Sequence, residues 1–540
     1  MQREQQSACP PSGRYDKEPY NEGRYRQCFF HSTHLILIRG SDMATMLCLL
    51  YALISIASLV DGLTPAQWRA QSIYQVMTDR FARTDGSTSA ACDFNEYCGG
   101  TWRGLINRLG YIQNMGFTAV WISPVVQNPI ATTGDGNSYH GYWANDVYKL
   151  NPRFGTANDL KALSSALHSR GMYLMVDVVP NHMGSVSTRA NVDYSQLRPF
   201  NQRSYYHNPC DIDYNNDTSI KQCWIGSNTV SLPDLRTEDS TVQNMWNTWI
   251  RQLVSNYSID GLRIDTAYQI NQGFWAGFQA AAGGIHTLGE VWHDSPSVVC
   301  PYQNYLHGLM NYPTYYWITQ AFQSTSGSIS NLVNGINTMK GGVCRDITLM
   351  GSFLENHDNN RFPSITSDNS LIQNAIAFQL LADGIPIVYQ GQEQKFNGGG
   401  VPANREQLWK SGYNQNSEFY LHIRKLNGIR SWAARQDSAY LTYNAWPIQS
   451  DSRTIVMRKG LNNRQIVSVY SNRGASGASA TITVGAGNSG FTNGQRVMEI
   501  LNCVESTADS RGNLGVTITQ GRPKVFYPSA SLGGSGICGR

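Results

Sequence analysis

Four short segments of this chain end in side chains that can carry charge or move protons: Asp177–His182, Gly261–Asp265, Gly289–Val291 and Phe353–Asp358. They supply three carboxylates, Asp265, Glu290 and Asp358. Carboxylates that converge on one pocket repel each other, so the pKa of at least one of them should rise. Glycoside hydrolysis uses such a set, because one ionised carboxylate attacks the sugar while a protonated one gives its proton to the leaving oxygen.

A cation and two histidines accompany these carboxylates. Arg263 lies two residues before Asp265, and in a strand this spacing places both side chains on the same side. A fixed cation there is expected to keep Asp265 ionised. His182 and His357 could donate hydrogen bonds to sugar hydroxyls or to carboxylates. Strand-terminal caps and ion pairs are the competing interpretation, and they explain single residues better than the whole set.

Short apolar strands alternate with helical segments between about residues 65 and 440. The predicted strands are Ile73–Thr78, Ala119–Ser123, Tyr173–Val179, Gly261–Asp265, His286–Val291, Leu349–Leu354 and Ile385–Tyr389. The predicted helices are Leu160–Arg170, Val242–Tyr257, Leu371–Ala382 and Ser417–Ala434. This order is typical of an α/β fold whose parallel sheet closes into a (β/α)8 TIM barrel, with the active site at the ends of the strands.

Two regions break the alternation of strands and helices. Residues 183–235 are rich in Asn, Asp, Tyr and Ser, and a long irregular insertion after a barrel strand is usually functional. After about residue 440, Gly- and Ser-rich turns separate short alternating strands, which predicts a small antiparallel β-sandwich. We therefore expect a catalytic barrel over residues 63–440, an inserted domain over 183–235 and a C-terminal sandwich over 441–540.

The only long apolar run covers residues 43–60. It is long enough to span a membrane, but we interpret residues 43–62 as a secretory signal that is cleaved after a small residue such as Gly62. A polar stretch, residues 1–42, precedes it. Translation could begin at Met43, the run could be an internal anchor, or residues 1–42 could be a gene-model extension. A buried helix is a further alternative, and the sequence leaves all of these open.

The cysteines favour export from the cell. Eight of the 11 follow Gly62, and an even set in a chain with a signal segment predicts disulfides and an oxidising compartment. Pairing of sequence neighbours is plausible but is not determined by spacing: Cys92/Cys98, Cys210/Cys223, Cys300/Cys344 and Cys503/Cys538. Two glycosylation sequons, Asn216-Asp-Thr and Asn256-Tyr-Ser, are compatible with export.

The amino-acid composition limits the kinds of ligand that the protein is expected to bind. The net charge is +4 over 540 residues without a basic block, which argues against a nucleic-acid surface. The 13 Trp and 29 Tyr suit core packing, and some of them suit stacking on the apolar faces of sugars. No nucleotide, flavin or haem motif occurs. We expect a carbohydrate as the ligand, and separately we expect the protein to be a monomer.

The four segments resemble the four signature regions of the α-amylase family, glycoside hydrolase family 13, and are most similar to secreted fungal α-amylases of the Taka-amylase type. Tyr139–Trp143, Asn256–Asp265 and Pro402–Glu406 also resemble that group, and the similarity runs from about Thr64 to Cys538. The resemblance implies a barrel, an excursion after its third strand and a C-terminal sandwich. It implies an extracellular, endo-acting hydrolase of α-1,4-glucosidic bonds in starch- or glycogen-type glucans.

Two other functions stay open at this point. A 4-α-glucanotransferase on the same scaffold would use the same three carboxylates, but a sugar hydroxyl instead of water would resolve its covalent intermediate. A non-catalytic glucan-binding or membrane-anchored accessory protein is the third possibility. The presence of all three carboxylates argues against it, since the loss of any one would have favoured it.

The resemblance also assigns roles to residues. Asp265 is expected to be the nucleophile, Glu290 the general acid and then the base, and Asp358 a stabiliser of the distorted sugar. Such a retaining mechanism predicts nucleophile and acid carboxyls roughly 5–5.5 Å apart. Arg263 would orient Asp265, and Arg405 would contact Asp358 or the neighbouring sugar. The other expected sugar contacts are His140, Tyr142, Trp143, His182, His357, Tyr268 and Gln269.

The family also binds a structural calcium ion between the barrel and the insertion. Asn181 and Asp234 match two of its side-chain ligands, and Gln269 could supply a backbone carbonyl. Lys221 stands where the family has an acidic ligand, which should weaken calcium binding. The competing interpretation is that Asn181 and Asp234 brace the insertion through hydrogen bonds alone.

The regions beside the carboxylates depart from the family pattern. Tyr268 and Gln269 stand where the fungal relatives carry a lysine and a histidine, and Val401 stands where they carry an aspartate that contacts sugars. The catalytic centre is therefore intact while its flanking sugar sites are altered. We expect weaker or differently placed binding of long starch chains, and more transfer to sugar acceptors.

Overall fold

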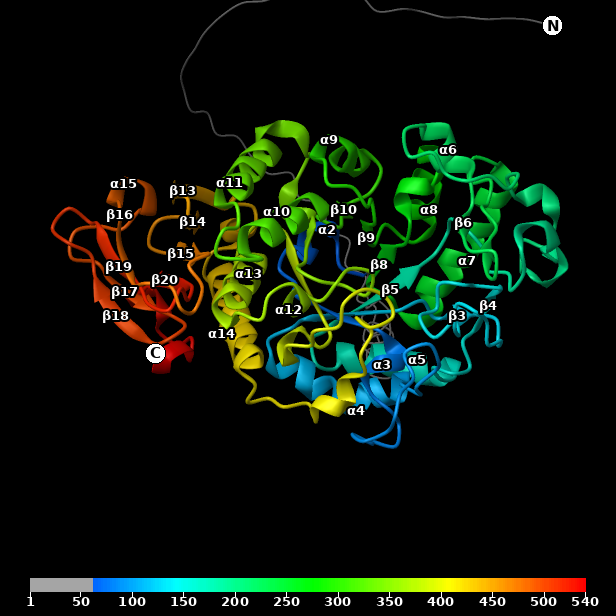
Figure 1. Cartoon of the computed structure of the whole chain (residues 1–540), viewed down its shortest axis with the longest axis horizontal. Helices are drawn as coiled ribbons and strands as arrows, with labels where there is room; N and C mark the ends of the chain where they lie inside the picture. Colours follow the sequence, from blue (N-terminus) through cyan, green and yellow to red (C-terminus); the bar gives the residue numbers. More distant parts are fainter. Residues whose placement is uncertain (1–61) are drawn as a thin grey trace, which may run out of the picture. The chain divides into compact units, whose positions relative to one another are not determined.

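The computed structural model describes residues 62–540, and its central feature is a barrel of parallel strands (Figure 1). The 8-stranded sheet runs in the order β10 (Gly308–Leu309), β9 (His286–Gly289), β8 (Gly261–Ile264), β5 (Tyr173–Val178), β2 (Ala119–Ile122), β1 (Ile73–Val76), β12 (Ile385–Tyr389) and β11 (Gly351–Ser352). A parallel bridge between Met310 and Gly351 joins its two edges. The predicted TIM barrel is confirmed.

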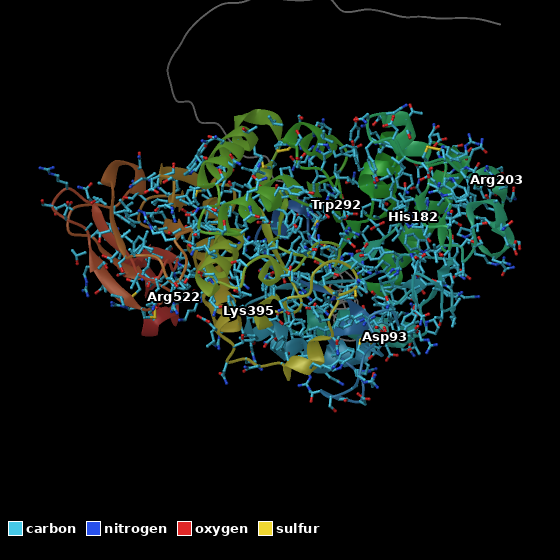
Figure 2. The ribbon with its side chains drawn as sticks, viewed as in Figure 1. Asp93, His182, Arg203, Trp292, Lys395 and Arg522 are labelled. Carbon is cyan, nitrogen blue, oxygen red and sulfur yellow. A yellow bond between two sulfur atoms is a disulfide. The ribbon has the colours of Figure 1, made fainter. Side chains whose placement is uncertain are left out.

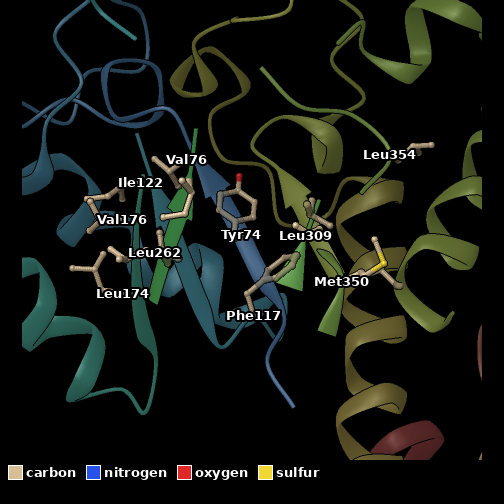
Figure 3. Packing of buried hydrophobic residues seen from close by; sticks show 14 of the residues in the cluster. Tyr74, Val76, Phe117, Ile122, Leu174, Val176, Leu262, Leu309, Met350 and Leu354 are labelled. Atoms are coloured by element: carbon tan, nitrogen blue, oxygen red, sulfur yellow. The ribbon is translucent and has the colours of Figure 1, made fainter. Parts of the chain in front are cut away.

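Barrel strands are buried on both faces, which explains why they read as continuous apolar runs. Alternate residues belong to two hydrophobic clusters. One cluster takes residues of the barrel interior, including Ile73, Ala119, Trp121, Met175 and Ile387. The other joins the outward-facing residues to the surrounding helices, and Figure 3 shows Val76, Ile122, Leu174, Val176 and Leu262 packed within it.

Helices lie between the strands in the sequence and cover the barrel. The longer ones are α4 (Trp102–Asn114), α5 (Ala157–His168), α7 (Ser240–Tyr257), α10 (Tyr312–Phe322), α11 (Ile329–Thr338), α13 (Asn369–Leu381) and α14 (Glu418–Gln436). Their N-terminal caps explain where several of them begin. The side chains of Thr101, Thr156, Asp239 and Asp368 accept hydrogen bonds from backbone N–H groups of the first turn.

Between β5 and α7 the chain leaves the barrel and forms mostly irregular structure. Its regular pieces are α6 (Asp217–Gln222), β6 (Ile225–Gly226) and β7 (Ser231–Leu232). Antiparallel bridges pair His182 with Asp234 and Ser185 with Ser231, so the start and the end of the excursion lie together. The excursion therefore begins and ends beside the strand that carries Asp177.

After α14 the sheets become antiparallel. One sheet has the order β13 (Trp446–Ser450), β14 (Thr454–Lys459), β15 (Ile466–Ser471), β20 (Lys524–Pro528), β17 (Arg496–Glu499) and β18 (Val504–Thr507). The second pairs β16 (Ala480–Val484) with β19 (Leu514–Ile518). Val456, Val484 and Val516 belong to one buried cluster drawn from both sheets, as expected of a sandwich. The hydroxyl of Tyr470 donates to the carbonyl of Ala377, which ties β15 to α13.

The sequence missed several elements. Strand β10 has two residues, too few to show a pattern, and α4, α10 and α11 were not predicted. Strand β11 covers only Gly351–Ser352, because residues 347–349 form a 3-10 turn instead of the start of a strand. β9 ends at Gly289, so Glu290 follows the strand directly.

All four pairs of sequence neighbours form disulfides: Cys92–Cys98, Cys210–Cys223, Cys300–Cys344 and Cys503–Cys538. The expected N-terminal extension at 1–42 and nearly all of the expected signal segment at 43–62 lie outside the described residues. Over residues 62–540, no helix combines the length and apolar character required to cross a membrane.

Candidate active site

A hollow of about 500 Å³ opens at the C-terminal ends of the barrel strands. Nine of the residues singled out from the sequence line it: His140, Tyr142, Trp143, His182, Asp265, Glu290, Asp358, Val401 and Arg405. Trp292 lines the same hollow, and Figure 2 labels both His182 and Trp292. The volume is in the range of small-molecule sites.

Neighbouring strands bring two of the carboxylates together. Asp265 follows β8 and Glu290 follows β9, and the two strands pair in parallel with Ile264 beside Gly289. The backbone N–H of Glu290 donates to the carbonyl of Ile264 at 2.9 Å. Asp358 comes from the loop after β11, where its N–H donates to the side-chain oxygen of Asn356 at 2.9 Å.

Arg263 links the carboxylates beneath the hollow. Its Nη1 lies 2.8 Å from Asp265 Oδ1, and its Nη2 lies 2.7 Å from Glu290 Oε1. Nη1 also lies 3.1 Å from Asp177 Oδ2, because Asp177 stands opposite Arg263 in the pairing of β5 with β8. Arg263 is buried, so one cation serves three carboxylates in a low-dielectric setting.

Burial dominates the electrostatics of this cluster. It raises the pKa of Asp265 well above its ordinary value, while Arg263 opposes the shift and the carboxylates of Glu290 and Asp177 add to it. Burial also raises the pKa of Asp177 to about 6, again against Arg263. The expected rise of at least one pKa is confirmed. Arg263 acts in the expected direction, since it lowers the pKa of Asp265 and so favours the ionised carboxylate, although burial is the larger influence.

The third carboxylate has its own cation. Arg405 Nη2 lies 3.1 Å from Asp358 Oδ1, so the expected contact is present. Arg405 Nε donates to the carbonyl of His357 at 2.9 Å, which fixes the guanidinium against the same loop. His357 Nε2 lies 3.1 Å from Asp358 Oδ2.

One wall of the hollow is aromatic. The hydroxyl of Tyr142 donates to Asp177 Oδ2 at 2.8 Å, and its ring stacks on His357 with centroids 5.2 Å apart. His140 Nδ1 accepts from the N–H of Tyr142 at 3.0 Å. Burial lowers the pKa of His140 and of His357, and lowers that of His182 to about 4. These imidazoles are therefore neutral near pH 7 and act as hydrogen-bonding groups.

Four of the expected sugar contacts do not line the hollow. Arg263 lies under its floor, and His357 lies behind Tyr142. Tyr268 and Gln269 belong to a 3-10 turn just after the segment that ends in Asp265, and Tyr268 instead lines a neighbouring hollow.

Sequence reasoning gave no role to several residues of the site. The hydroxyl of Tyr312 donates to Glu290 Oε1 at 3.2 Å, and the N–H of Thr266 donates to Glu290 Oε2 at 3.0 Å. Asp177 could have been found, because it lies on the strand that leads to Asn181. Trp292 carries a weaker signal, its position two residues after Glu290.

The residues expected to hold calcium lie together at the base of the excursion. Asn181 Oδ1 and Asp234 Oδ1 are buried oxygens without hydrogen-bond partners, which suits a hard cation. The ammonium of Lys221 donates to the carbonyl of Tyr268 and to the hydroxyl of Tyr302. That places a positive charge beside the turn that carries Gln269. No cluster of three or more His, Cys, Asp or Glu side chains suited to a metal occurs between residues 62 and 540.

Comparison with known proteins gives one consistent result. Residues 75–500 match the family model described as the α-amylase catalytic domain. An α-amylase 1 from Lipomyces kononenkoae is 55% identical over 485 residues, 89% of this chain and 77% of the relative. An α-amylase 2 from Schwanniomyces occidentalis is 50% identical over 476 residues, 88% of this chain and 93% of the relative. A solved α-amylase from Malbranchea cinnamomea superposes with a TM-score of 0.85 at 48% identity, covering 88% of this chain and 100% of the other.

Proposed function

Because the chain belongs to the α-amylase family of glycoside hydrolases, we propose that it cleaves internal α-1,4-glucosidic bonds of starch- or glycogen-type glucans with retention of configuration. The observation that carries this proposal is the bridge formed by Arg263. Its two terminal nitrogens lie 2.8 Å and 2.7 Å from Asp265 and Glu290, so one rigid group holds a nucleophile and an acid at the end of adjacent strands.

In the first step Asp265 attacks the anomeric carbon as its carboxylate, and the bond from that carbon to the leaving glucosyl oxygen breaks. Glu290 gives its proton to this oxygen, and the sugar is left on Asp265 as an ester. The hydrogen bonds from Tyr312 and Thr266 hold the two oxygens of Glu290. These contacts orient the carboxyl of Glu290, which lines the hollow.

In the second step a water molecule attacks the same carbon. Glu290, now ionised, takes the proton of the water, and Asp265 leaves as a carboxylate. Asp358, held by Arg405, accepts hydrogen bonds from hydroxyls of the distorted sugar. These hydrogen bonds become stronger in the transition state. The positive charge that develops on the sugar is stabilised by the excess negative charge of the cluster.

Endo action is supported by the shape of the site. The catalytic hollow does not end at Glu290, because Trp292 lines both it and a second hollow of about 480 Å³. A chain that continues past the cleaved bond can be accommodated there, as internal cleavage requires.

Product analysis tests this proposal. Proton NMR during early hydrolysis of maltoheptaose should show the α-anomer as the first product, and chromatography should show fragments of several lengths. Asp265→Asn should lose at least about 10⁴-fold in kcat. Glu290→Gln should lose less on an aryl maltoside, whose leaving group needs no proton, than on maltoheptaose. Asp509→Asn, an exposed carboxylate on the C-terminal sheets, is the matched control. An initial β-anomer, or full activity in Asp265→Asn, contradicts the proposal.

Calcium is part of the proposal as a structural ion. Asn181 and Asp234 would supply side-chain oxygens and Gln269 a backbone carbonyl, and the ion would tie the excursion to the barrel. The ammonium of Lys221 near the same turn repels a divalent cation, so the affinity is low.

The proposed location is extracellular, and the proposed active form is a monomer. Four disulfides fit an oxidising compartment and would be unusual in a reducing one. The signal segment expected before Gly62 would provide the route. Detection of the mature chain in culture medium, with its N-terminus sequenced, tests the export and the cleavage site together.

A further inference from the structure

A pocket of about 190 Å³ lies where helices α13 and α14 meet the C-terminal sheets, in the region that Figure 1 draws between yellow helices and orange strands. The two helices line it together with the turn after β17 and the turn before β20. Its lining residues are Gln373, Glu418, Leu421, His422, Lys425, Leu501, Asn502, Arg522 and Pro523. None of these nine residues lines the catalytic hollow, so the pocket is separate from the candidate active site.

Two cations line this pocket, and most of their hydrogen-bonding capacity is unused. The ammonium of Lys425 donates to the carbonyl of Leu501 at 2.6 Å, which occupies one of its three N–H groups. Within residues 62–540, the guanidinium of Arg522, labelled in Figure 2, has a single ionic neighbour, Glu418. The distance of 3.8 Å between them is too long for a hydrogen bond. The pocket therefore offers an ammonium and a guanidinium to a ligand.

The one carboxylate of the lining, that of Glu418, already has other partners. Its Oε1 accepts from Gln373 Nε2 and its Oε2 accepts from Asn369 Nδ2, both at 2.9 Å. Amide groups of α13 thus hold both oxygens of Glu418. Because two cations face a single carboxylate, the lining carries an excess of positive charge.

Both cations also lie near a buried histidine. His422 Nε2 donates to the carbonyl of Gln373 at 3.0 Å. Burial is the largest cause that lowers the pKa of His422 to about 4, and the charges of Lys425 and Arg522 contribute to the shift. The imidazole is therefore neutral near pH 7, and it leaves the charge of the two cations uncompensated.

The turn that carries Arg522 is held against the barrel. Ser370 Oγ donates to the carbonyl of Gln520 at 2.7 Å, and Asn374 Nδ2 donates to the carbonyl of Gly521 at 2.8 Å. These hydrogen bonds attach the turn to α13. The backbone of Arg522 is thus in place before any ligand binds.

The facing turn, which follows β17, is fixed as well. The carboxylate of Glu499 accepts from the N–H groups of Leu501 and Asn502, each at 3.1 Å. Since both turns are already ordered, a ligand in the pocket does not have to order the backbone, and this lowers the cost of binding.

We propose that this pocket binds a phosphate dianion, either as free inorganic phosphate or as a phosphate monoester carried by a sugar. Two cations on separate elements suit a dianion, and a guanidinium forms paired hydrogen bonds with phosphate oxygens. The surrounding charge attracts the same ligand, because residues 441–540 contain ten Lys and Arg against four Asp and Glu. A bound phosphate joins α14 to the turn before β20 and so stabilises the junction of the barrel with the C-terminal sheets.

Thermal unfolding tests for the site. In chelator, and at an ionic strength held constant with NaCl, inorganic phosphate should raise the thermal midpoint of wild type in a saturable manner. Isothermal titration calorimetry then gives the Kd. Acetate and glucose, measured in the same way, should not shift the midpoint. A midpoint that rises with phosphate without saturation reflects exclusion of the salt from the protein surface, and it overturns the proposal.

Substitutions of neighbouring residues should change the affinity in opposite directions. Arg522→Gln and Lys425→Gln should each raise the Kd for inorganic phosphate on the order of tenfold, since each removes a charge-assisted contact. Glu418→Gln removes the only carboxylate of the lining and should lower the Kd, a gain that damage to the fold could not produce. Arg511→Gln, an exposed arginine outside the lining, is the matched control and should leave the Kd unchanged. Equal weakening in all four variants would reduce the effect to net charge and overturn the proposal.

Glucose 6-phosphate distinguishes the two sources of the phosphate group. A Kd at least about tenfold below that of inorganic phosphate assigns the pocket to a sugar monoester, whereas equal or weaker binding assigns it to free phosphate. Either result supports the site, and binding of neither ligand overturns it. The kcat on maltoheptaose should be the same in wild type, Arg522→Gln and Lys425→Gln, because neither residue lines the catalytic hollow. Failure of phosphate binding therefore leaves the proposed hydrolysis standing.

Discussion

Two buried ion clusters of this molecule carry excess charge of opposite sign. At the catalytic end of the barrel, Arg263 alone faces three carboxylates. Where the barrel meets the C-terminal sheets, Asp383 alone faces two ammonium groups, with Lys459 Nζ at 2.6 Å and Lys340 Nζ at 3.6 Å. Each cluster carries an excess of one charge, and both are largely shielded from water.

The surroundings of the two clusters differ. The N–H of Ala445 donates to both oxygens of Asp383, and Lys459 donates to the carbonyl of Tyr443, so backbone groups satisfy the junction cluster. The cavity beside it holds only about 30 Å³, whereas the carboxylates at Arg263 border about 500 Å³. A buried ion cluster is therefore not by itself a sign of activity. A functional site is indicated instead by an ion cluster with an excess of one charge that borders a cavity large enough for a ligand.

Removing the central ion of the catalytic cluster should have the largest effect. Arg263→Met leaves three buried carboxylates without a cation, and we expect a loss of about 3–5 kcal/mol in stability at neutral pH and at least about 10³-fold in kcat. Because burial already raises the pKa of Asp265 and Asp177, the folded variant binds protons that the unfolded chain releases. Its stability should therefore fall as pH rises from 5 to 8.

Chemical unfolding at several pH values, together with kinetics on maltoheptaose, measures both effects of Arg263→Met. Arg263→Lys is the control. It keeps the charge but cannot bridge two carboxylates with two nitrogens, so it should recover more stability than activity. If Arg263→Met were as stable as wild type at every pH, the three carboxylates would not need the cation for stability, which would contradict this prediction.

Removing the central ion of the junction cluster is the matching experiment. Asp383→Asn leaves two ammonium groups without their carboxylate and should cost about 3 kcal/mol of stability. The kcat of the folded enzyme should stay at the wild-type value, because Asp383 lines the small cavity beside the C-terminal sheets and not the catalytic hollow. A drop in kcat comparable to that of Arg263→Met would contradict the distinction between the two clusters.

The pH dependence of Lys340 gives a smaller and more specific effect. Burial lowers its pKa from 10.5 to about 8, partly offset by Asp383. Between these pH values the unfolded chain binds a proton that the folded chain does not, so the contribution of Lys340 to stability becomes more favourable as pH rises. Relative to Lys340→Met, wild type should gain roughly 2 kcal/mol between pH 8 and 10. A parallel pH profile for the two proteins would contradict this assignment.

The smallest expected effect concerns Lys221 and calcium binding. The ammonium of Lys221 lies beside the turn that carries Gln269, one of the expected calcium ligands. For wild type, we expect millimolar calcium to change the free energy of unfolding by less than about 1 kcal/mol relative to chelator. Lys221→Glu replaces a cation with a potential ligand, and calcium should then add more than about 2 kcal/mol. Thermal midpoints with and without chelator, compared within each variant, give the result. Equal shifts in the two proteins would show that Lys221 does not oppose the ion.

Much of the fold and of the candidate active site could be predicted, because the residues concerned lie close together in the sequence. Strand β8 was found within one residue, and the period of two correctly placed Arg263 beside Asp265. The hairpin-rich C-terminal region was also evident, because alternation of apolar residues marks strands with one buried face. Strand β10 could not be found, since its two residues, Gly308 and Leu309, are too few to show a period.

What remained hidden depends on contacts across the chain. Burial is the largest cause of the raised pKa of Asp265, and the local sequence pattern does not show how deeply this residue is buried. The position of Lys221 against the Tyr268 turn joins residues of the excursion and the barrel, and only the folded chain shows that its ammonium contacts a carbonyl and two rings. Trp292 looked like any other aromatic residue until its exposure between two hollows was known.

The four disulfides close loops that follow one another without overlap, with sequence separations of 6, 13, 44 and 35 residues. A chain that enters an oxidising compartment N-terminus first presents these cysteines in the order in which they pair. From Cys92 onward, the correct partner of each unpaired thiol is always the next cysteine to arrive. The simplest order of oxidation therefore gives the native pairs, and it requires no exchange between disulfides.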